Sequence, residues 1–239
     1  MRTRLPFFFV VLAVAAPAPA ATRNFGVTGF DRIRVDGPYK VRLATGIAPF
    51  AKASGSMAAL DRVAIEVQGR TLIVQANQSW GGYPGQDIGP VEITVGTHEL
   101  SSAWLNGAGS LQIDKVKALA FDVSVNGSGL LGIGNADVDQ LRVFIAGTAS
   151  ATLAGRTGKM TAILRGNSSL DATGLVTKDA AIGADGPATV KADVTNSAKV
   201  DASGVATISL TGSPACTNKL TGSASVSGCK PSTWDGSNY

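Results

Sequence analysis

Apolar and polar residues alternate along most of the chain, and the pattern returns about every twenty residues. The clearest markers are glycines followed by small residues, which recur at steps of 20, 20, 19 and 20 residues. They are Gly107, Gly127, Gly147, Gly166 and Gly186. Related turns follow at Asn196, Gly212 and Gly222. A fixed period of this length is typical of proteins built from stacked repeats.

Each repeat contains two short runs in which every second residue is apolar. The fourth and sixth residues after a turn form one run, as in Leu111 and Ile113. Another run precedes the next turn, as in Phe121 and Val123. A period of two predicts strands rather than helices. The second residue after each turn is small, which fits a corner with no room for a large side chain.

These repeats predict an all-β fold, a β-solenoid similar to a parallel β-helix with coils of about 20 residues. One such unit cannot bury its apolar face alone, whereas stacked units bury a continuous column. Equivalent residues of successive coils would lie about 4.8 Å apart. Apolar columns would point inward, and columns of Ser, Thr and Asn would form polar ladders outside. The alternative is an antiparallel sandwich with a turn every ten residues, but the columns persist better at twenty.

The first part of the chain also predicts strands, without the strict period. A hairpin is expected where the alternating run 63–67 meets Leu72 and Val74 across a turn at 68–71. We interpret 21–105 as an N-terminal β region that caps the solenoid, 106–229 as the repeat solenoid and 230–239 as a flexible tail. Strand edges near 91–106 would then be the docking site for a protein partner.

Three segments carry a resemblance to a known family. They are the run from Phe30 to Leu43 with its Asp36-Gly37-Pro38 turn, the Leu72-Ile73-Val74 strand, and the glycine turns at 107, 127 and 147. Over about residues 25–228 the chain resembles the auto-transporter adhesin head family, also called the head GIN domain. The resemblance implies an exported bacterial protein with a β-helical body. It implies no catalytic residues.

The N-terminus has the order of a secretory signal peptide. Arg2 and Arg4 precede an apolar run at 5–16, and small residues follow up to Ala20. We expect a signal peptide at 1–20, cleavage after Ala20 and an exported protein, periplasmic or extracellular. A membrane anchor is the alternative, but the run is shorter than the roughly 20 residues needed to span a bilayer. No second apolar segment follows, so the mature chain is expected to lack a membrane span.

Charge and composition exclude several classes of function. Charged residues make up only 16% of the chain, and its formal charge of +4 falls to +2 when Arg2 and Arg4 are removed. Lys and Arg are dispersed among acids, so we expect no nucleic-acid partner. One His and two Cys cannot form a ligand cluster for zinc, haem or an iron–sulfur centre. We therefore expect no metal and no cofactor.

The two cysteines, Cys216 and Cys229, lie in the terminal coils of a chain expected to be exported. They predict a disulfide, because exported proteins meet oxidising conditions. By loop entropy the bond would stabilise the fold by about 3 kcal/mol.

Candidate ligand-binding residues lie in a Gly- and Pro-rich loop at 77–87. Trp80 and Tyr83 stand there among amides, a combination suited to stacking against sugar rings. The alternative is that both rings fold back over the cap as packing residues. Trp104, just before the first coil, is interpreted as packing.

Acidic residues give only a weak indication of catalysis. Asp171 and Asp201 fall in one predicted outward column with Lys191 between them, and β-helical polysaccharide lyases use clustered acids with a basic residue. Two acids in one column are better explained as a solvated face. His98 and Glu99 are interpreted as a surface pair.

We therefore predict an exported structural or adhesive β-solenoid that is not an enzyme. Its expected ligand is a glycan of the cell envelope or of the extracellular surroundings. The alternatives are a carbohydrate-active enzyme on a β-helix and an envelope-associated module that binds a protein.

Overall fold

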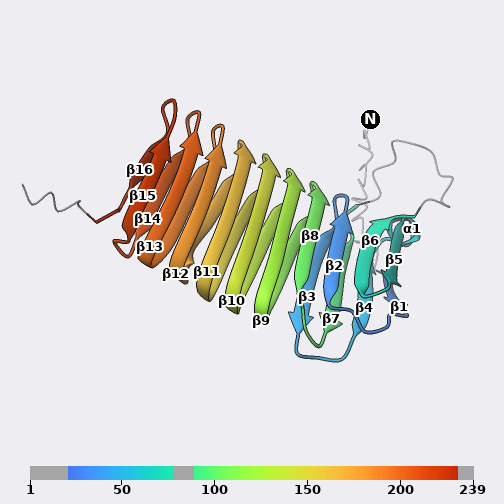
Figure 1. Ribbon diagram of the computed structural model, residues 1–239. Coiled ribbons are helices and arrows are strands. Elements are labelled where there is room, and N and C mark those ends of the chain that lie inside the picture. The colour runs from blue at the N-terminus through green and yellow to red at the C-terminus, as the bar shows by residue number, and fades with distance from the viewer. Residues whose placement is uncertain (1–20, 78–88, 231–239) are drawn as a thin grey trace, which may run out of the picture.

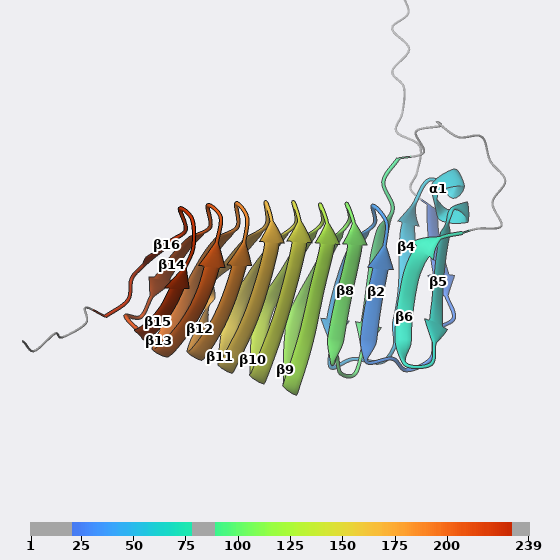
Figure 2. The ribbon, with the colours of Figure 1, turned by 45° about the horizontal axis from the view of Figure 1, so that its top comes forward.

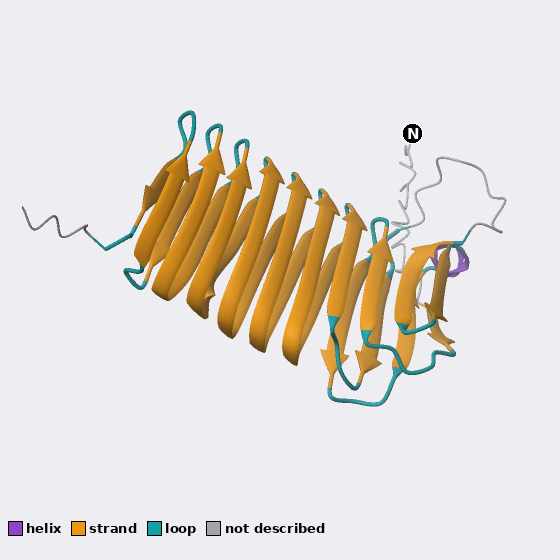
Figure 3. Cartoon of the chain, viewed as in Figure 1, coloured by secondary structure: helices purple, strands orange, loops and turns teal. Residues whose placement is uncertain are grey.

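A computed structural model describes residues 21–77 and 89–230. Strands form almost all of this part of the chain and wind into a β-solenoid of about six turns (Figure 1). Figure 3 shows the same dominance of strand, with one short helix at the N-terminal end. The predicted all-β solenoid is confirmed, and the antiparallel sandwich is not observed.

The coils are made by long strands that bend around the solenoid and by shorter strands near its C-terminal end. They are β9 (Ser110–Gly127), β10 (Leu130–Gly147), β11 (Ser150–Gly166), β12 (Ser169–Asp185), β13 (Thr189–Ser203), β14 (Thr207–Thr211), β15 (Ala215–Leu220) and β16 (Ser225–Ser227). The N-terminal region contributes β1 (Ala21–Phe25), β2 (Arg32–Asp36), β3 (Lys40–Thr45), β4 (Phe50–Gly55), α1 (Met57–Asp61), β5 (Val63–Gln68), β6 (Thr71–Ala76), β7 (Glu92–Thr97) and β8 (Ser102–Gly107).

Each coil has two long faces and a short side. The first face contains β3, the segments 110–113, 130–133, 150–153, 169–172 and 189–192, and strands β14 and β16. The second face contains β2, β8, the segments 121–127, 141–147, 160–166, 180–185 and 198–203, and β15. The short side joins them around residues 115–118 and their equivalents. All ladders between coils are parallel.

Inward columns form the core, as the alternation predicts. On the first face Leu111 pairs in register with Leu131, and both are buried. On the second face the column that starts at Phe121 is buried along its length until it reaches Cys216 near the end of the solenoid. Its members are Phe121, Leu141, Met160, Ala180, Ala198 and Cys216. Neighbouring coils thus bury one another's apolar face.

A column of glycines turns the chain from the second face to the first. All of them have positive φ, a conformation that costs free energy for any residue with a Cβ. They are Gly37, Gly107, Gly127, Gly147, Gly166, Gly186, Gly204 and Gly222. The corner beside this column is tight: a Cβ placed on Gly109 would lie 2.6 Å from the carbonyl oxygen of Gly37. The predicted corner without room is therefore present.

The glycine column corrects the repeat predicted for the last coils. Gly204 stacks on Gly186 and carries Gly222 above it, whereas Asn196 and Gly212 lie elsewhere on the coil. These coils have 18 residues, so a period of 20 assigned the wrong turns. The register shifts between adjacent coils all fall between residues 133 and 136, 152 and 154, or 172 and 179, on or beside the short side. Both long faces keep their register.

The parallel ladder extends into the predicted N-terminal cap. β2 and β3 are joined through Gly37 and form a coil of their own, because β2 pairs with β8 and β3 pairs with β9. Beyond this coil, antiparallel strands end the two faces: β4 and β1 end the first, and the hairpin β5–β6 ends the second. The hairpin has the predicted register, with Gln68 opposite Thr71.

The expected docking edge near 91–106 is wrong. β7 lies between β4 and β3. β8 lies between β2 and β9 (Figure 2). Both strands are therefore paired on both sides. Within the described chain, the strands paired on one side only are β1 and β5 at one end and β15 and β16 at the other. Residues inserted between β3 and β8 supply the missing partners, a placement that local sequence does not reveal.

The predicted disulfide joins Cys216 and Cys229, with 5.7 Å between their Cα atoms. It links β15 to the residues after β16, and Lys230 N donates to Pro214 O at 3.0 Å in the same region. The bond therefore ties together the last coil. Within the described part of the chain, no helix is long and apolar enough to cross a membrane.

Candidate functional site

The predicted ligand-binding residues Trp80 and Tyr83 lie outside the described residues, so their role in glycan stacking stays a prediction. Among residues 21–77 and 89–230, no group of three His, Cys, Asp or Glu side chains could hold a metal ion. The candidate sites therefore come from the surfaces of the coils.

The predicted acidic column does not exist. Asp171 pairs in register with Lys191 on the first face, whereas Asp201 lies on the second face, where its carboxylate is 3.8 Å from Lys219 Nζ. The prediction failed for the same reason as the misassigned turns, because the position of Asp201 was counted from Asn196 as if Asn196 were a corner. The two aspartates cannot act on one substrate bond.

Several carboxylates are held ionised by hydrogen bonds. The side chain and backbone N–H of Thr173 donate to Asp171 and lower its pKa. Hydrogen bonds from Arg156 lower the pKa of Asp137, and those from Ser197 and Asn196 lower that of Asp179. A general acid needs a pKa near the working pH. The pKa values of Asp137, Asp171 and Asp179 are instead lowered, away from the working pH, so none of the three is suited to act as a general acid.

A shallow groove runs along the second face, parallel to the solenoid axis. One hollow in it has a volume of about 290 Å³ and lies over Trp104, Ser124, Phe144 and Ile163, which occupy one outward column on successive coils. A second hollow of about 240 Å³ shares Ile163 and continues to Asp201. From Trp104 to Asp201 the column advances five strand spacings, or about 24 Å.

The groove presents aromatic rings at a fixed spacing. Trp104 and Phe144 are half-buried and two coils apart, about 10 Å along the axis. Ser124 lies between them and leaves a gap, while Ile163 continues the apolar surface with 42% of its area exposed. Trp104 is half-buried and faces outward into the groove, so it is not a core residue. The alternation alone indicates this, because Ala103 on one side points inward.

Polar groups border the groove on both sides. On one side Arg142 and Asp122 form an ion pair of 3.2 Å. On the other, Asn126 donates to Asn106 at 3.2 Å, which extends the predicted asparagine ladder. The guanidinium of Arg165 lies 6.0 Å from the centre of the Phe144 ring, in the range of a weak cation–π contact. Rings with polar neighbours can stack on a sugar while its hydroxyls find hydrogen-bond partners.

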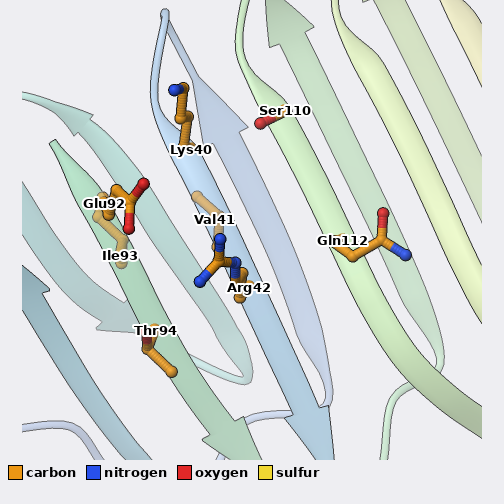
Figure 4. A pocket seen from close by; sticks show the side chains of 8 residues that line it. All are labelled: Lys40, Val41, Arg42, Glu92, Ile93, Thr94, Ser110 and Gln112. Carbon is orange, nitrogen blue, oxygen red and sulfur yellow. The ribbon is translucent and has the colours of Figure 1, made fainter. Parts of the chain in front are cut away.

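A smaller hollow of about 90 Å³ lies on the first face between β7, β3 and β9 (Figure 4). Arg42 stands between Thr94 and Gln112 in register, and Glu92 pairs in register with Lys40. In Figure 4, Gln112 extends away from Arg42 toward the next coil. The hollow is too small for a sugar ring, and the carboxylate of Glu92 offsets one of its two cations.

Further along the first face lies the predicted hydroxyl ladder. One outward column carries five consecutive hydroxyl residues, each one coil from the next. They are Ser150, Ser169, Thr189, Thr207 and Ser225. This face therefore offers hydrogen bonds without aromatic rings.

His98 and Glu99 are both exposed, as interpreted from the sequence. They also line another hollow, where the N-terminal region meets the first long coil. Sequence reasoning missed it because its other walls come from residues 115–137.

Comparisons with known proteins agree with the fold. The family model described as "Putative auto-transporter adhesin, head GIN domain" matches residues 29–214. No curated protein matches the chain in sequence.

Several solved structures share the fold at low sequence identity. A "putative adhesin" from Bacteroides fragilis has a TM-score of 0.78 and 18% identity, and the match covers 87% of this chain and 95% of that one. A "putative lipid binding protein" from Parabacteroides distasonis has a TM-score of 0.69 and 17% identity, with coverage of 87% and 95%. A "putative adhesin" from Parabacteroides merdae has a TM-score of 0.64 and 16% identity, with the same coverage.

Proposed function

Since the chain belongs to the family described as "Putative auto-transporter adhesin, head GIN domain", we propose that it is an exported adhesive protein that binds glycan without transforming it. The adhesin-like solenoid is the family's fold, and the disulfide suits an exported protein. The ligand is a glycan of the cell envelope or of the extracellular surroundings, bound in the groove of the second face.

The spacing of Trp104 and Phe144 is the observation that carries this proposal. The parallel ladder fixes the two rings about 10 Å apart, with Ser124 between them. This distance is close to the disaccharide repeat of an extended β-linked glycan, so alternate sugar rings would meet the two aromatic rings. A chain lying along the axis would also pass the polar groups of Asp122, Arg142 and Asn126. Rigid aromatic side chains supply contact area at low entropic cost.

The enzyme alternative has less support. A glycosidase or lyase on this scaffold needs acids and bases converging on one groove. Among residues 21–77 and 89–230, the acids lining the groove are Asp122, which is paired with Arg142, and Asp201, near its far end. The protein-binding alternative was based on strand edges near 91–106, and both strands there, β7 and β8, are paired on each side.

The test is glycan binding by the mature, oxidised protein and by matched variants. Trp104→Ala and Phe144→Ala should each weaken binding of a neutral β-linked oligosaccharide about tenfold, a loss of about 1.4 kcal/mol. Leu130→Ala is the control, because Leu130 is 60% exposed on the opposite face and should bind normally. Trp80→Ala tests the predicted loop contact in the same series.

Three results would contradict the proposal. Equal binding by all variants would remove the groove from recognition. New reducing ends released from a bound glycan would make the protein an enzyme. Displacement of the glycan by a fatty acid, with tighter binding of the acid, would favour a lipid ligand for the apolar groove, in line with the name of one structural neighbour.

A further inference from the structure

The hollow at His98 is a cleft between the N-terminal region and the first long coils, with a volume of about 290 Å³. One wall comes from the ends of β3 and β7, the other from the short side of β9 and β10. Its lining includes His98, Glu99, Lys115, Lys117 and Asp137. Residues far apart in sequence therefore place five ionisable side chains around one opening.

Hydrogen bonds within and between the two walls hold the cleft in shape. Asp114 Oδ1 accepts from the backbone N–H of Thr45 at 3.0 Å and from that of Lys115 at 2.6 Å. Thr45 Oγ1 donates to Lys115 O at 2.9 Å, and Gly46 N donates to His98 O at 3.0 Å. The backbone that carries Lys115 and His98 is thus fixed before any ligand arrives.

The acids of the cleft are already paired, whereas its lysines are not. Asp137 accepts two hydrogen bonds from Arg156, at 2.8 and 3.0 Å, and these lower its pKa. Glu99 lies 3.5 Å from Arg70. In the described part of the chain Lys115 and Lys117 form no ion pair, although the charge of Lys117 also helps to lower the pKa of Asp137. Two ammonium groups are therefore available to a ligand.

Leu100 and Val116 close the bottom of the cleft and are almost completely buried, at 2% and 1% exposure. They expose almost no apolar surface, so a ligand meets mainly the polar groups of the rim. The ammonium groups of Lys115 and Lys117 and the amide of Asn135 suit a ligand that carries an anionic group and hydroxyls. A sugar acid has both.

We propose that this cleft binds the anionic group of an acidic glycan, a carboxylate or phosphate carried on a sugar ring. Lys115 and Lys117 contact the anion, and the sugar ring lies over the bottom of the cleft. Asn135 supplies an amide at the rim. The identification of the ligand as a glycan rests on the proposed function, but the cleft itself is separate from the aromatic groove. Arg42 in the small hollow of Figure 4 is the rival cation.

The experiment measures binding of glucuronate oligosaccharides, their neutral glucose counterparts and inorganic phosphate to the mature protein, at low and physiological salt. The double variant Lys115→Gln/Lys117→Gln should lose affinity for the acidic ligand at least about tenfold and keep its affinity for the neutral one. Lys115→Arg/Lys117→Arg should restore binding, because it restores the charge. Arg42→Gln is the matched control and should bind normally. Thermal unfolding of each variant checks that the fold is retained.

The outcomes separate this inference from the proposed function. Loss with Arg42→Gln, and none with the lysine double variant, would overturn the assignment of the cleft. Equal affinity for acidic and neutral ligands would do the same, and binding of inorganic phosphate alone would overturn the assignment to a glycan. If Trp104→Ala loses the neutral ligand and the lysine variant keeps the acidic one, the groove stands and the assignment of the cleft is overturned. If Trp104→Ala loses nothing but the lysine variant loses the acidic ligand, the cleft stands without the groove.

Discussion

Replacing Gly127 by alanine tests the glycine corner on which the solenoid is built. Gly127 has φ of 109°, a region that side chains with a Cβ rarely adopt. A Cβ at this position would also lie 2.8 Å from the carbonyl oxygen of Gly107 in the preceding coil. Both effects act on backbone, so no flexible side chain can move aside to relieve them.

The expected loss of stability follows from these two effects. An unfavourable φ costs about 1–3 kcal/mol, and forcing an extra carbon into a packed corner costs about 1–3 kcal/mol. Alanine recovers about 0.4–1 kcal/mol by restricting the unfolded chain. The free energy of unfolding should therefore fall by about 1–5 kcal/mol, with a central value of about 3 kcal/mol. For a chain of this size Tm should fall by roughly 5–15 °C.

Urea unfolding followed by circular dichroism measures the change. The control is Gly183→Ala on the second face, where a Cβ would meet nothing closer than 3.9 Å and φ is not positive. This variant should remain within about 0.5 kcal/mol of the parent. If both variants lose the same stability, or if Gly127→Ala loses less than about 1 kcal/mol, the reasoning about the corner column is refuted.

Three further predictions concern other parts of the chain. The double variant Cys216→Ser/Cys229→Ser should lower the free energy of unfolding by about 3 kcal/mol. The loss should appear mainly as faster hydrogen exchange in residues 207–227, and unchanged exchange there would show that the disulfide does not stabilise the last coil. Asp137, Asp171 and Asp179 have lowered pKa values, so the stability that they contribute is complete above about pH 4 and is lost as the pH falls through their folded values. The triple Asn variant should therefore show a shallower fall of the urea midpoint between about pH 5 and pH 2 than the parent; a parallel fall would contradict this. The exported protein should begin at Ala21, which intact mass or N-terminal sequencing will show, and a retained residue 20 would refute the predicted cleavage.

The fold was predictable because the inward columns depend on local alternation. Leu111 and Leu131 are twenty residues apart and occupy equivalent inward positions, so periodicity alone places them together. The hairpin at 68–71 and the pairing of Cys216 with Cys229 are similarly local. Where the coils shorten to 18 residues, this reasoning fails. Gly204 was then missed as a corner, and Asp201 was assigned to the wrong face.

The candidate sites were less predictable than the fold. The outward direction of Trp104 follows from its inward neighbours, so that signal was present in the alternation. The cleft is different, because Thr45 and Lys115 are 70 residues apart in the chain and meet only because β3 pairs with β9. This pairing is a tertiary property, and neither the single histidine nor the lysines mark it in the sequence.

The confinement of register shifts to the short side has a consequence for engineering this scaffold. An insertion there changes the perimeter of one coil and leaves both long faces in register, as the natural change from 20 to 18 residues already does. A one-residue insertion within a face would turn every following inward side chain of that strand outward. Peptide tags, epitopes or fluorophore sites should therefore be grafted at the exposed residues Thr173 and Gly174, which lie between the buried Ala172 and Leu175.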